Sequence, residues 1–344
     1  MYKKSLTKVN YQEITNQLIK IMEDGVIPMG SRWKSERNKR MPFNIATGNS
    51  YRGMNIIQLW VNEMVNSYTS NGWMTINQMR TINMEEEGKP IKLIHLPHNT
   101  PDRANNKTGQ TGIPVFHSGS FIPREWEMQN TGDNPVYRSN QSGDYANKDQ
   151  VTYTYLKIAG YVFNLDQIEN LPEKYAKFDE LLPFEDMQPE IARMTTSYGC
   201  PINLSPMGRC YYVPSKHEIY LAHQNTFVTP ADFERTKFHE LIHSTGHKTL
   251  LDRFPESQSM ETKEYCMEEL IAEIGAAFMS AEFGIEGLMV HAEYLEHYIK
   301  LLKGDCKAIF KAAAKAQAAT ELLMSHVHHQ ENHNENHQIR SFAN

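Results

Sequence analysis

The sequence contains little cysteine and no long apolar run. No two cysteines are spaced as CxxC, and the four thiols are scattered along the chain: Cys200, Cys210, Cys266 and Cys306. This spacing argues against a thiolate zinc site and a disulfide framework, so we expect free thiols in a reducing cytoplasm. A membrane-spanning helix needs about 18 or more consecutive apolar residues, and no stretch approaches that length. The basic start is not followed by an apolar signal segment, so a soluble, uncleaved protein without a membrane partner is expected.

The composition is that of an ordinary globular protein. Apolar residues make up 40% of the 344 residues and charged residues 22%. Both fractions are close to the average for soluble domains, which excludes a fibrous or wholly disordered chain. At about 150 residues per domain, the length corresponds to roughly two domains.

The charge is distributed unevenly. The formal net charge is −6, but residues 1–60 carry ten Lys and Arg against four Asp and Glu, a local charge of +6 that leaves −12 for the rest. Attraction to phosphates acts within about a Debye length, roughly 8 Å in the cell, so this segment alone indicates an anionic partner. An ordinary solvated surface is the alternative interpretation.

Apolar periodicity predicts both helices and strands. Residues 11–22 and 54–65 repeat apolar side chains at three- and four-residue steps, which is typical of amphipathic helices. Residues 28–53 lie between them and combine Pro, Gly, Asn and Ser with basic and aromatic residues, which indicates a long loop. Residues 91–96 and 151–163 have the pattern of strands. We therefore predict an α+β protein.

Two polar segments help to divide the chain. Residues 98–150 are rich in Asn, Gly, Ser, Thr and Asp, and we expect them to form a polar, partly mobile insertion. We place the first domain at residues 1–172 and a more helical, acidic second domain at 173–325. Residues 326–344 form a histidine-rich tail that we expect to be disordered and to bind metal only adventitiously.

The strongest chemical motif is the run His239-Glu240-Leu241-Ile242-His243. Just before it, Thr229 offers an N-cap and Pro230 the first position of a helix. We therefore predict a helix over residues 230–245 that stops at Gly246.

On that helix, the motif has the geometry of a catalytic zinc site. Residues four apart differ by about 40° in direction, so His239 and His243 project from one face and can reach a single ion. Glu240 lies about 100° around the helix, where it can take a proton from an attacking water. A structural histidine pair on an amphipathic helix is the alternative.

The third ligand is expected from a second helix. Glu269 follows His243 by 26 residues and lies one turn before Glu273. We predict that Glu269 completes a site for Zn²⁺, or another divalent transition metal, while Glu273 orients a ligand imidazole. Glu268 is the alternative ligand.

A hairpin precedes the motif helix. Residues 210–221 alternate as two strands, and the edge of such a hairpin can hold an extended substrate by backbone pairing. Tyr211 and Tyr212 are candidates for stabilising an oxyanion, with one side chain pointing into the core and the other outward. A hairpin that only completes the core is the alternative.

Several longer segments have the pattern of a known family. They are residues 44–55, 59–60, 73–75, 162–168, 212–221, 239–253, 268–278 and 294–319, together with Trp33. In these segments the chain resembles the plasmid and phage antirestriction proteins of the ArdC type, which share their organisation with the amino-terminal part of conjugative plasmid primases. The resemblance implies a single-stranded-DNA-binding first domain and a zincin-like metallopeptidase second domain. The chain departs from the family pattern at three positions. It has His217 where Asp is common in the family, Ser244 where Trp is usual and Leu250 where Arg is usual.

The first domain has residues suited to a single DNA strand. Single strands are held by basic grooves and by aromatic side chains on which bases stack. The basic and aromatic candidates are Trp33, Lys34, Arg37, Lys39, Arg40, Tyr51 and Arg52.

The expected function follows from both domains. We expect a mobile-element protein, active in a bacterial host, that binds single-stranded DNA and hydrolyses a protein substrate such as a host defence protein. The alternative is a non-catalytic protein that coats single-stranded DNA and whose metal site is structural.

Overall fold

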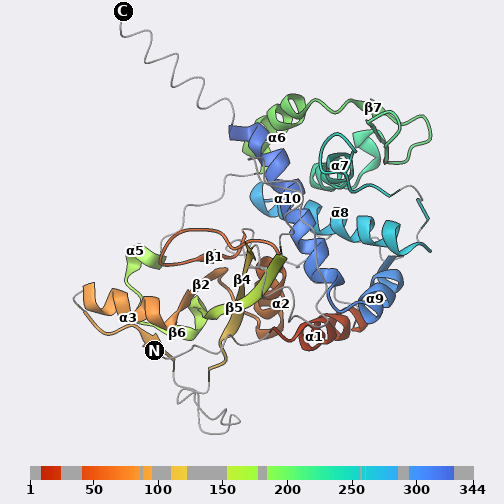
Figure 1. The fold of residues 1–344 in the computed structure, drawn as a ribbon. Helices are drawn as coiled ribbons and strands as arrows, with labels where there is room; N and C mark the ends of the chain where they lie inside the picture. Colours follow the sequence, from red (N-terminus) through yellow and green to blue (C-terminus); the bar gives the residue numbers. More distant parts are fainter. Residues whose placement is uncertain are drawn as a thin grey trace, which may run out of the picture.

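Figure 1 shows the computed structural model. The structure describes residues 9–24, 41–85, 88–94, 110–121, 153–176, 184–255, 258–259, 261–285 and 294–328. Helices and sheets are mixed, as predicted, in an α+β arrangement. Within the described part of the chain, no helix has the length and apolar character that crossing a membrane requires.

The N-terminal half is built around a four-stranded sheet. Its strand order is β1-β2-β5-β4, in which β1 runs parallel to β2 and the other neighbours are antiparallel. These strands are β1 (Phe43–Asn44), β2 (Gly72–Thr75), β4 (Ile113–Phe121) and β5 (Tyr153–Asn164). A two-stranded ribbon pairs β3 (Lys92–Leu93) with β6 (Ile168–Glu169). The helices of this half are α1 (Tyr11–Glu23), α2 (Met54–Asn66) and α3 (Ile76–Glu85).

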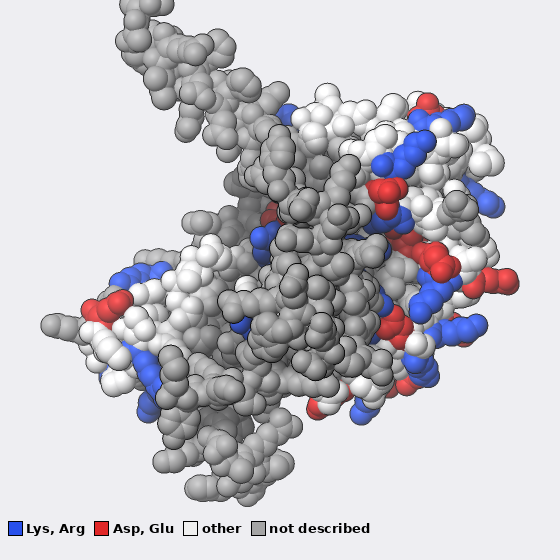
Figure 2. All heavy atoms as spheres, in the orientation of Figure 1, with Lys and Arg blue, Asp and Glu red and all other residues white. Residues whose placement is uncertain are grey.

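The C-terminal half is mainly helical. Its helices are α5 (Glu173–Ala176), α6 (Phe184–Tyr198), α7 (Pro230–Thr245), α8 (Lys263–Glu282), α9 (Leu295–Gly304) and α10 (Ala308–His328). A three-stranded sheet of order β7-β9-β8 is formed by β7 (Ile202–Leu204), β8 (Tyr211–Val213) and β9 (Glu218–Leu221). On the face shown in Figure 2, acidic and basic side chains are interspersed over this half.

The helix that carries the HExxH motif begins and ends as predicted. The Thr229 side chain accepts a hydrogen bond from the backbone of Asp232 at 3.1 Å, and the Asp232 carboxylate accepts one from the Thr229 backbone at 2.9 Å. Pro230 occupies the first helical position, and Gly246 caps the end. The predicted helices at 11–22 and 54–65 are confirmed as α1 and α2.

Two sequence predictions need correction. Residues 113–121, inside the predicted insertion, form strand β4, which pairs along β5. Burial of Ile113 and Val115 drives this pairing, although the polar residues around the strand concealed its pattern. The predicted tail also starts too early, because His326 still belongs to α10. Apart from residues 110–112, the rest of the predicted insertion lies outside the described residues, and so does the tail from residue 329.

One buried core connects the two halves. It includes Leu18 and Met22 of α1, Trp60 of α2 and Leu302 of α9. Helix α10 crosses the molecule and contacts α2 on one side and α6, α7 and α8 on the other (Figure 1). The helices that position the motif are therefore held in place by both halves of the chain.

Candidate metal centre

Helix α7 brings the two motif histidines together. Both side chains are buried, and their Nε2 atoms lie 3.1 Å apart. The rings stand at 85° to each other, with centroids 4.6 Å apart. The predicted projection of His239 and His243 from one helix face is therefore present.

Helix α8 faces α7 at very close range. A Cβ atom added to Gly275 would lie 2.8 Å from Cδ1 of Ile242, which is closer than real contacts allow. Glycine at this position therefore lets the two helix backbones approach. The approach carries Glu269 to the histidines: its Oε1 lies 3.4 Å from His243 Nε2, and its Oε2 lies 3.6 Å from His239 Nε2.

These three side chains fit a divalent cation. Ligand atoms at about 2.0 Å from a tetrahedral ion lie roughly 3.3 Å from one another. The three measured separations among His239, His243 and Glu269 are 3.1, 3.4 and 3.6 Å. Two imidazole nitrogens that face each other at this distance need a proton or a cation between them, because otherwise each presents a lone pair to the other. The donor set of two imidazoles and one carboxylate is common to zinc and manganese sites.

The far nitrogens of both rings face carboxylates. Nδ1 of His239 lies 3.8 Å from Oε1 of Glu273, the residue predicted to orient a ligand. Nδ1 of His243 lies 3.2 Å from Oε1 of Glu268. Glu268 therefore faces the outer nitrogen of a ligand and not the Nε2 pair, which differs from its predicted role as alternative ligand.

Arg253 holds the carboxylate of Glu268 in place through hydrogen bonds. Its Nε and Nη2 donate to the two oxygens of Glu268, each at 3.1 Å, and its Nη1 donates to Thr245 Oγ1 at 2.7 Å. Nη2 also donates to the carbonyl of Ile242 at the end of α7. Both side chains are almost completely buried. Arg253 ends the segment 239–253 that carries the family resemblance, but no role was predicted for it, because it becomes a partner only where the chain after α7 folds back onto α8.

The charges of the site favour a cation between the histidines. Burial alone would lower the pKa of His243, but the charge of Glu269 and hydrogen bonds with Glu268 and Glu269 outweigh it and raise the pKa to about 10. Burial would raise the pKa of Glu269, yet His243 and His239 hold it well below its usual range. A proton on His243 therefore competes with a metal ion for the same position.

Glu240 is close enough to Cys210, before β8, and to Tyr265 of α8 to act on both electrostatically. The side chain of Glu240 is buried. Burial is the main reason why the pKa values of Cys210 and Tyr265 are raised, and the charge of Glu240 raises both further. Tyr265 also forms a hydrogen bond with Glu269. Tyr265 was not predicted from the sequence, although it stands one helical turn before Glu269 and so shares its face.

The hairpin tyrosines point in opposite directions, as predicted. Tyr212 is buried, and its hydroxyl lies 2.9 Å from Nδ1 of His217. Tyr211 stacks on Tyr220, with ring centroids 5.1 Å apart. The Tyr212 hydroxyl is thus already engaged with a histidine of the hairpin turn, and the oxyanion role of either tyrosine stays a prediction.

Two departures from the family pattern have local partners. Ser244 is fully buried, and its Oγ lies 2.9 Å from the hydroxyl of Tyr198. The small side chain leaves room for that tyrosine beside α7. His217 occupies a left-handed position with φ 53°, and its ring lies 4.4 Å from that of His247.

Two of the predicted DNA-binding residues are described. Tyr51 is half-buried, and its hydroxyl accepts a hydrogen bond from Asn44 Nδ2 at 3.2 Å. Arg52 is exposed and forms an ion pair with Glu321 of α10. The other candidates lie outside the described residues: Trp33, Lys34, Arg37, Lys39 and Arg40.

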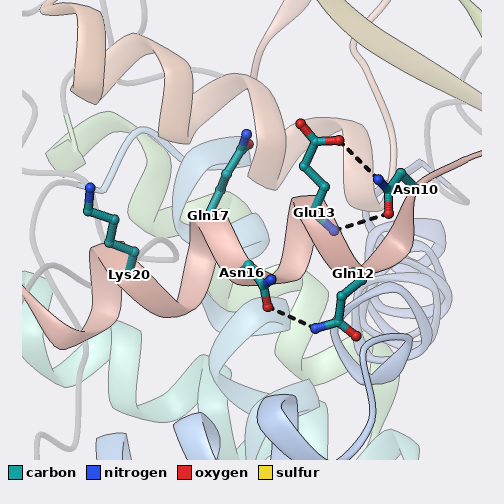
Figure 3. A pocket seen from close by; sticks show the side chains of 6 residues that line it. All are labelled: Asn10, Gln12, Glu13, Asn16, Gln17 and Lys20. Atoms are coloured by element: carbon teal, nitrogen blue, oxygen red, sulfur yellow. Dashed lines mark hydrogen bonds between the residues drawn. The ribbon is translucent and has the colours of Figure 1, made fainter.

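A polar hollow lies elsewhere, along α1 (Figure 3). Its lining includes Asn10, which donates to Glu13 Oε2 at 3.1 Å, and Gln12, which donates to Asn16 Oδ1 at 2.8 Å. These pairs are three or four residues apart and so are ordinary contacts along an exposed helix surface.

Comparison with protein families divides the chain into two matched segments. Residues 8–159 match the N-terminal domain of anti-restriction factor ArdC. Residues 189–315, which contain all of α7, α8 and α9 and the first part of α10, match the zincin-like metallopeptidase family.

Curated relatives match most of this chain at low identity. A DNA primase TraC from Escherichia coli is 27% identical over 321 residues, which cover 92% of this chain and 27% of the primase. A second Escherichia coli TraC primase is 25% identical over 321 residues, or 20% of its length. The chain thus spans about a quarter of these primases or less. Protein y4eC of Sinorhizobium fredii is 25% identical over 340 residues, 97% of this chain and 96% of that protein.

Solved structures share the fold over almost the whole chain. The Mn(II)-bound crystal structure of antirestriction protein ArdC from plasmid R388 is 28% identical, with a TM-score of 0.65, and the match covers 94% of this chain and 99% of that one. The metal-free structure of the same protein gives the same score, with coverages of 93% and 98%. The likeness to a chain that holds a divalent ion agrees with the donor set formed by α7 and α8.

Proposed function

We propose that this chain, a member of the ArdC-type antirestriction family, joins a single-stranded-DNA-binding domain at residues 1–172 to a metallopeptidase domain at 173–325. The observation that carries the peptidase assignment is the set of three buried ligand atoms on α7 and α8, separated by 3.1 to 3.6 Å, next to the acid of the HExxH motif. The proposed native ion is Zn²⁺, held by His239, His243 and Glu269.

Each protein group has a defined task in this proposal. A divalent ion bound there would supply Lewis-acid polarisation of a peptide carbonyl and of water. Glu240 accepts the proton of the attacking water at its carboxylate and then donates it to the nitrogen of the leaving amine. The hydrogen bond from Tyr265 helps to hold the Glu269 carboxylate in place.

The surroundings of the site favour a peptide as substrate. Cys210, at the start of the β8–β9 hairpin, lies close enough to Glu240 for the carboxylate to influence its pKa. Strand β8 is an edge of its sheet, so its outer backbone groups can pair with an extended chain. A host defence protein with a flexible segment is the proposed substrate.

The DNA-binding part of the proposal has separate support. The first 60 residues carry a net charge of +6 on an otherwise acidic chain. The match to the N-terminal domain of ArdC covers residues 8–60 of this basic segment. Attraction to a phosphate backbone is therefore expected to weaken with salt.

Metal content and cleavage test the peptidase assignment in two steps. The parent protein, shortened after residue 328 to remove the histidine-rich tail, should bind one divalent ion, and the double variant His239→Ala, His243→Ala should bind none. Glu240→Gln should keep the ion but lose cleavage of an unfolded protein substrate by about 10²- to 10⁴-fold, because only proton transfer is removed. Equal metal content in the double variant would refute the site. Equal cleavage by Glu240→Gln would refute the role of the base.

A further inference from the structure

The turn of the β8–β9 hairpin contacts the segment that follows the motif helix. His217 is the last residue of this turn, and His247 comes two residues after the end of α7. The centroids of their rings lie 4.4 Å apart, with 30° between the two planes. Both side chains are half-buried. Two imidazoles therefore stack on each other where the hairpin meets the end of the motif helix.

Both rings are held in this stack by further contacts. Nδ1 of His217 lies 2.9 Å from the hydroxyl of Tyr212, and the carbonyl of His217 accepts a hydrogen bond from the thiol of Cys200 at 3.4 Å. Its φ of 53° lies in the left-handed region, so the turn fixes the backbone as well. Nδ1 of His247 lies 2.8 Å from Oγ1 of Thr249. Neither ring can turn away without breaking one of these contacts.

Aromatic contacts continue from the hairpin to the metal centre. The ring of Tyr212 lies 5.5 Å from that of Phe254, and the ring of Phe254 lies 5.7 Å from that of the ligand His243. Just before β8, Cys210 is close enough to the motif acid Glu240 for the carboxylate to influence its pKa. Strand β8 therefore begins near the proposed catalytic base, and the turn that follows it is held by the histidine stack.

Protonation changes the sign of this contact. Two neutral imidazoles attract each other, whereas two imidazolium ions at this separation repel. Burial lowers the pKa of His217 from 6.5, and the charge of His247 lowers it further. The docked hairpin thus disfavours the proton on His217. Docking is therefore most stable above about pH 6.5 and weakens as the pH falls below that value.

Other ionisable groups surround this imidazole without adding a free negative charge to the stack. Burial raises the pKa of the Cys200 thiol to about 11 and that of the Tyr212 hydroxyl well above its usual value, so both groups are neutral near pH 6. The carboxylate of Glu218 accepts a hydrogen bond from the Tyr220 hydroxyl at 2.7 Å. Lys216, the preceding residue of the turn, is exposed and positively charged. The second imidazole of the stack is therefore the group whose protonation decides whether the contact attracts or repels.

We propose that His217 is a positioning residue for the proposed peptidase: stacked on His247, it holds the edge strand β8 where a peptide can pair with it, and it releases the strand when both rings are protonated. The inference rests on the proposed function, because it depends on β8 as the strand that binds an extended peptide. Peptide binding then depends on pH through a contact that lies outside the metal ligands.

Hydrogen exchange in the full-length protein tests the contact directly. In the parent protein the β8 amides, corrected for their intrinsic rates, should exchange about five- to tenfold faster at about pH 5.5 than at about pH 7.5. His247→Phe keeps an aromatic ring in the stack but cannot carry a charge, so exchange should be equally slow at both values. His217→Asn tolerates the left-handed backbone but loses the stack, so exchange should be fast at both values.

Cleavage of an unstructured peptide by the protein with Zn²⁺ separates positioning from a purely structural role. Between the same two pH values, KM of the parent protein should rise about five- to tenfold, whereas KM of His247→Phe should stay within about twofold. The change in kcat, which includes any loss of the ion in acid, should be the same in both proteins. His117→Phe replaces an exposed histidine of β4 by another aromatic residue and should keep the pH dependence of the parent protein.

The outcomes distinguish this inference from the proposed function. If exchange of β8 in His247→Phe responds to pH as it does in the parent protein, the histidine stack is not the pH-sensitive contact and the inference is wrong. An equal rise of KM in both proteins would also overturn the positioning role, while the peptidase assignment would stand. If exchange follows the expected pattern but none of the proteins cleaves a peptide, the proposed function is wrong and the positioning role falls with it.

Discussion

Arg253 donates hydrogen bonds from Nε and Nη2 to the two carboxylate oxygens of Glu268, at 3.1 Å each. Oε1 of Glu268 in turn lies 3.2 Å from Nδ1 of His243. This contact turns a residue outside the HExxH motif into a support for the motif. The planar guanidinium matches the carboxylate with two parallel hydrogen bonds, which lysine cannot do. The orientation of the His243 ring is therefore set by a residue in the segment after α7.

Weakening this support should loosen metal binding. Arg253→Lys removes one of the two parallel bonds, and Glu268→Gln removes the charge behind His243. Each should lower metal affinity by about 10- to 100-fold, the usual effect of losing an outer partner of a ligand histidine. Competition with a chelator measures the affinity, and the visible spectrum of the cobalt-loaded protein reports the altered geometry. Arg193→Lys, at an exposed arginine, is the control. Unchanged affinity in a folded Glu268→Gln protein would show that the contact plays no part in binding.

Protection of DNA from restriction should not require the peptidase base. A protein that covers a single strand obstructs other enzymes without chemistry, whereas proteolysis requires a contact with each restriction enzyme. We therefore expect Glu240→Gln to protect incoming plasmid DNA in cells as well as the parent protein does. Loss of protection by Glu240→Gln, with DNA and metal binding intact, would instead identify proteolysis as the mechanism.

Glu63 should make stability depend on pH. This carboxyl is buried and accepts a hydrogen bond from Trp73 Nε1 at 3.0 Å. Burial raises its pKa from 4.5 to about 8, so the folded state holds a proton that the unfolded state has released between these values. The free energy of unfolding should therefore fall as pH rises from about 4.5 to about 8, by an amount on the order of a few kcal/mol.

A neutral amide isolates this effect. Glu63→Gln keeps an oxygen acceptor for Trp73 and should flatten the pH dependence in that window, so that the variant is the more stable protein above pH 8. Urea unfolding at several pH values measures the difference. Glu85→Gln, at an exposed glutamate, should leave the pH dependence unchanged. The same slope in Glu63→Gln and the parent protein would assign the pH dependence to other groups.

The helix crossing at Gly275 should tolerate no side chain. Gly275→Ala places a methyl group within 2.8 to 2.9 Å of three carbons of Ile242 and should cost about 1–3 kcal/mol of stability. Gly304→Ala, where nothing lies within 4 Å, is the matched control and should cost little. Adding Ile242→Ala to Gly275→Ala should cost less than the sum of the two single changes, because the clash disappears. Strict additivity in unfolding experiments would contradict the close approach.

The sequence predicted those parts of the fold that depend on neighbouring residues. The limits of α7 follow from Thr229, Pro230 and Gly246, which act within one turn of the helix ends. Strand β4 was missed because the interactions that stabilise it are not between neighbouring residues. It pairs with β5, which lies more than thirty residues further along the chain. Arg253 was missed for a similar reason, since it meets Glu268 only after the chain has turned back.

The candidate site shows the same division. His239, His243 and Glu240 were predicted from spacing on one helix, and Glu269 from its position on the next. The choice between Glu268 and Glu269 required the direction in which α8 faces α7. That direction is set at Gly275, where the missing side chain allows the helices to touch.

The core that both halves share has a consequence for synthesis. Helices α1 and α2 leave the ribosome early, but α9 and α10, which cover their apolar sides, are translated near the other end of the described chain. At about 5–20 residues per second, the nascent chain carries these uncovered sides for on the order of tens of seconds. During that interval the apolar side chains of Leu18, Met22 and Trp60 can bind a chaperone, so the yield of native protein depends on the chaperones present in the cell that makes it.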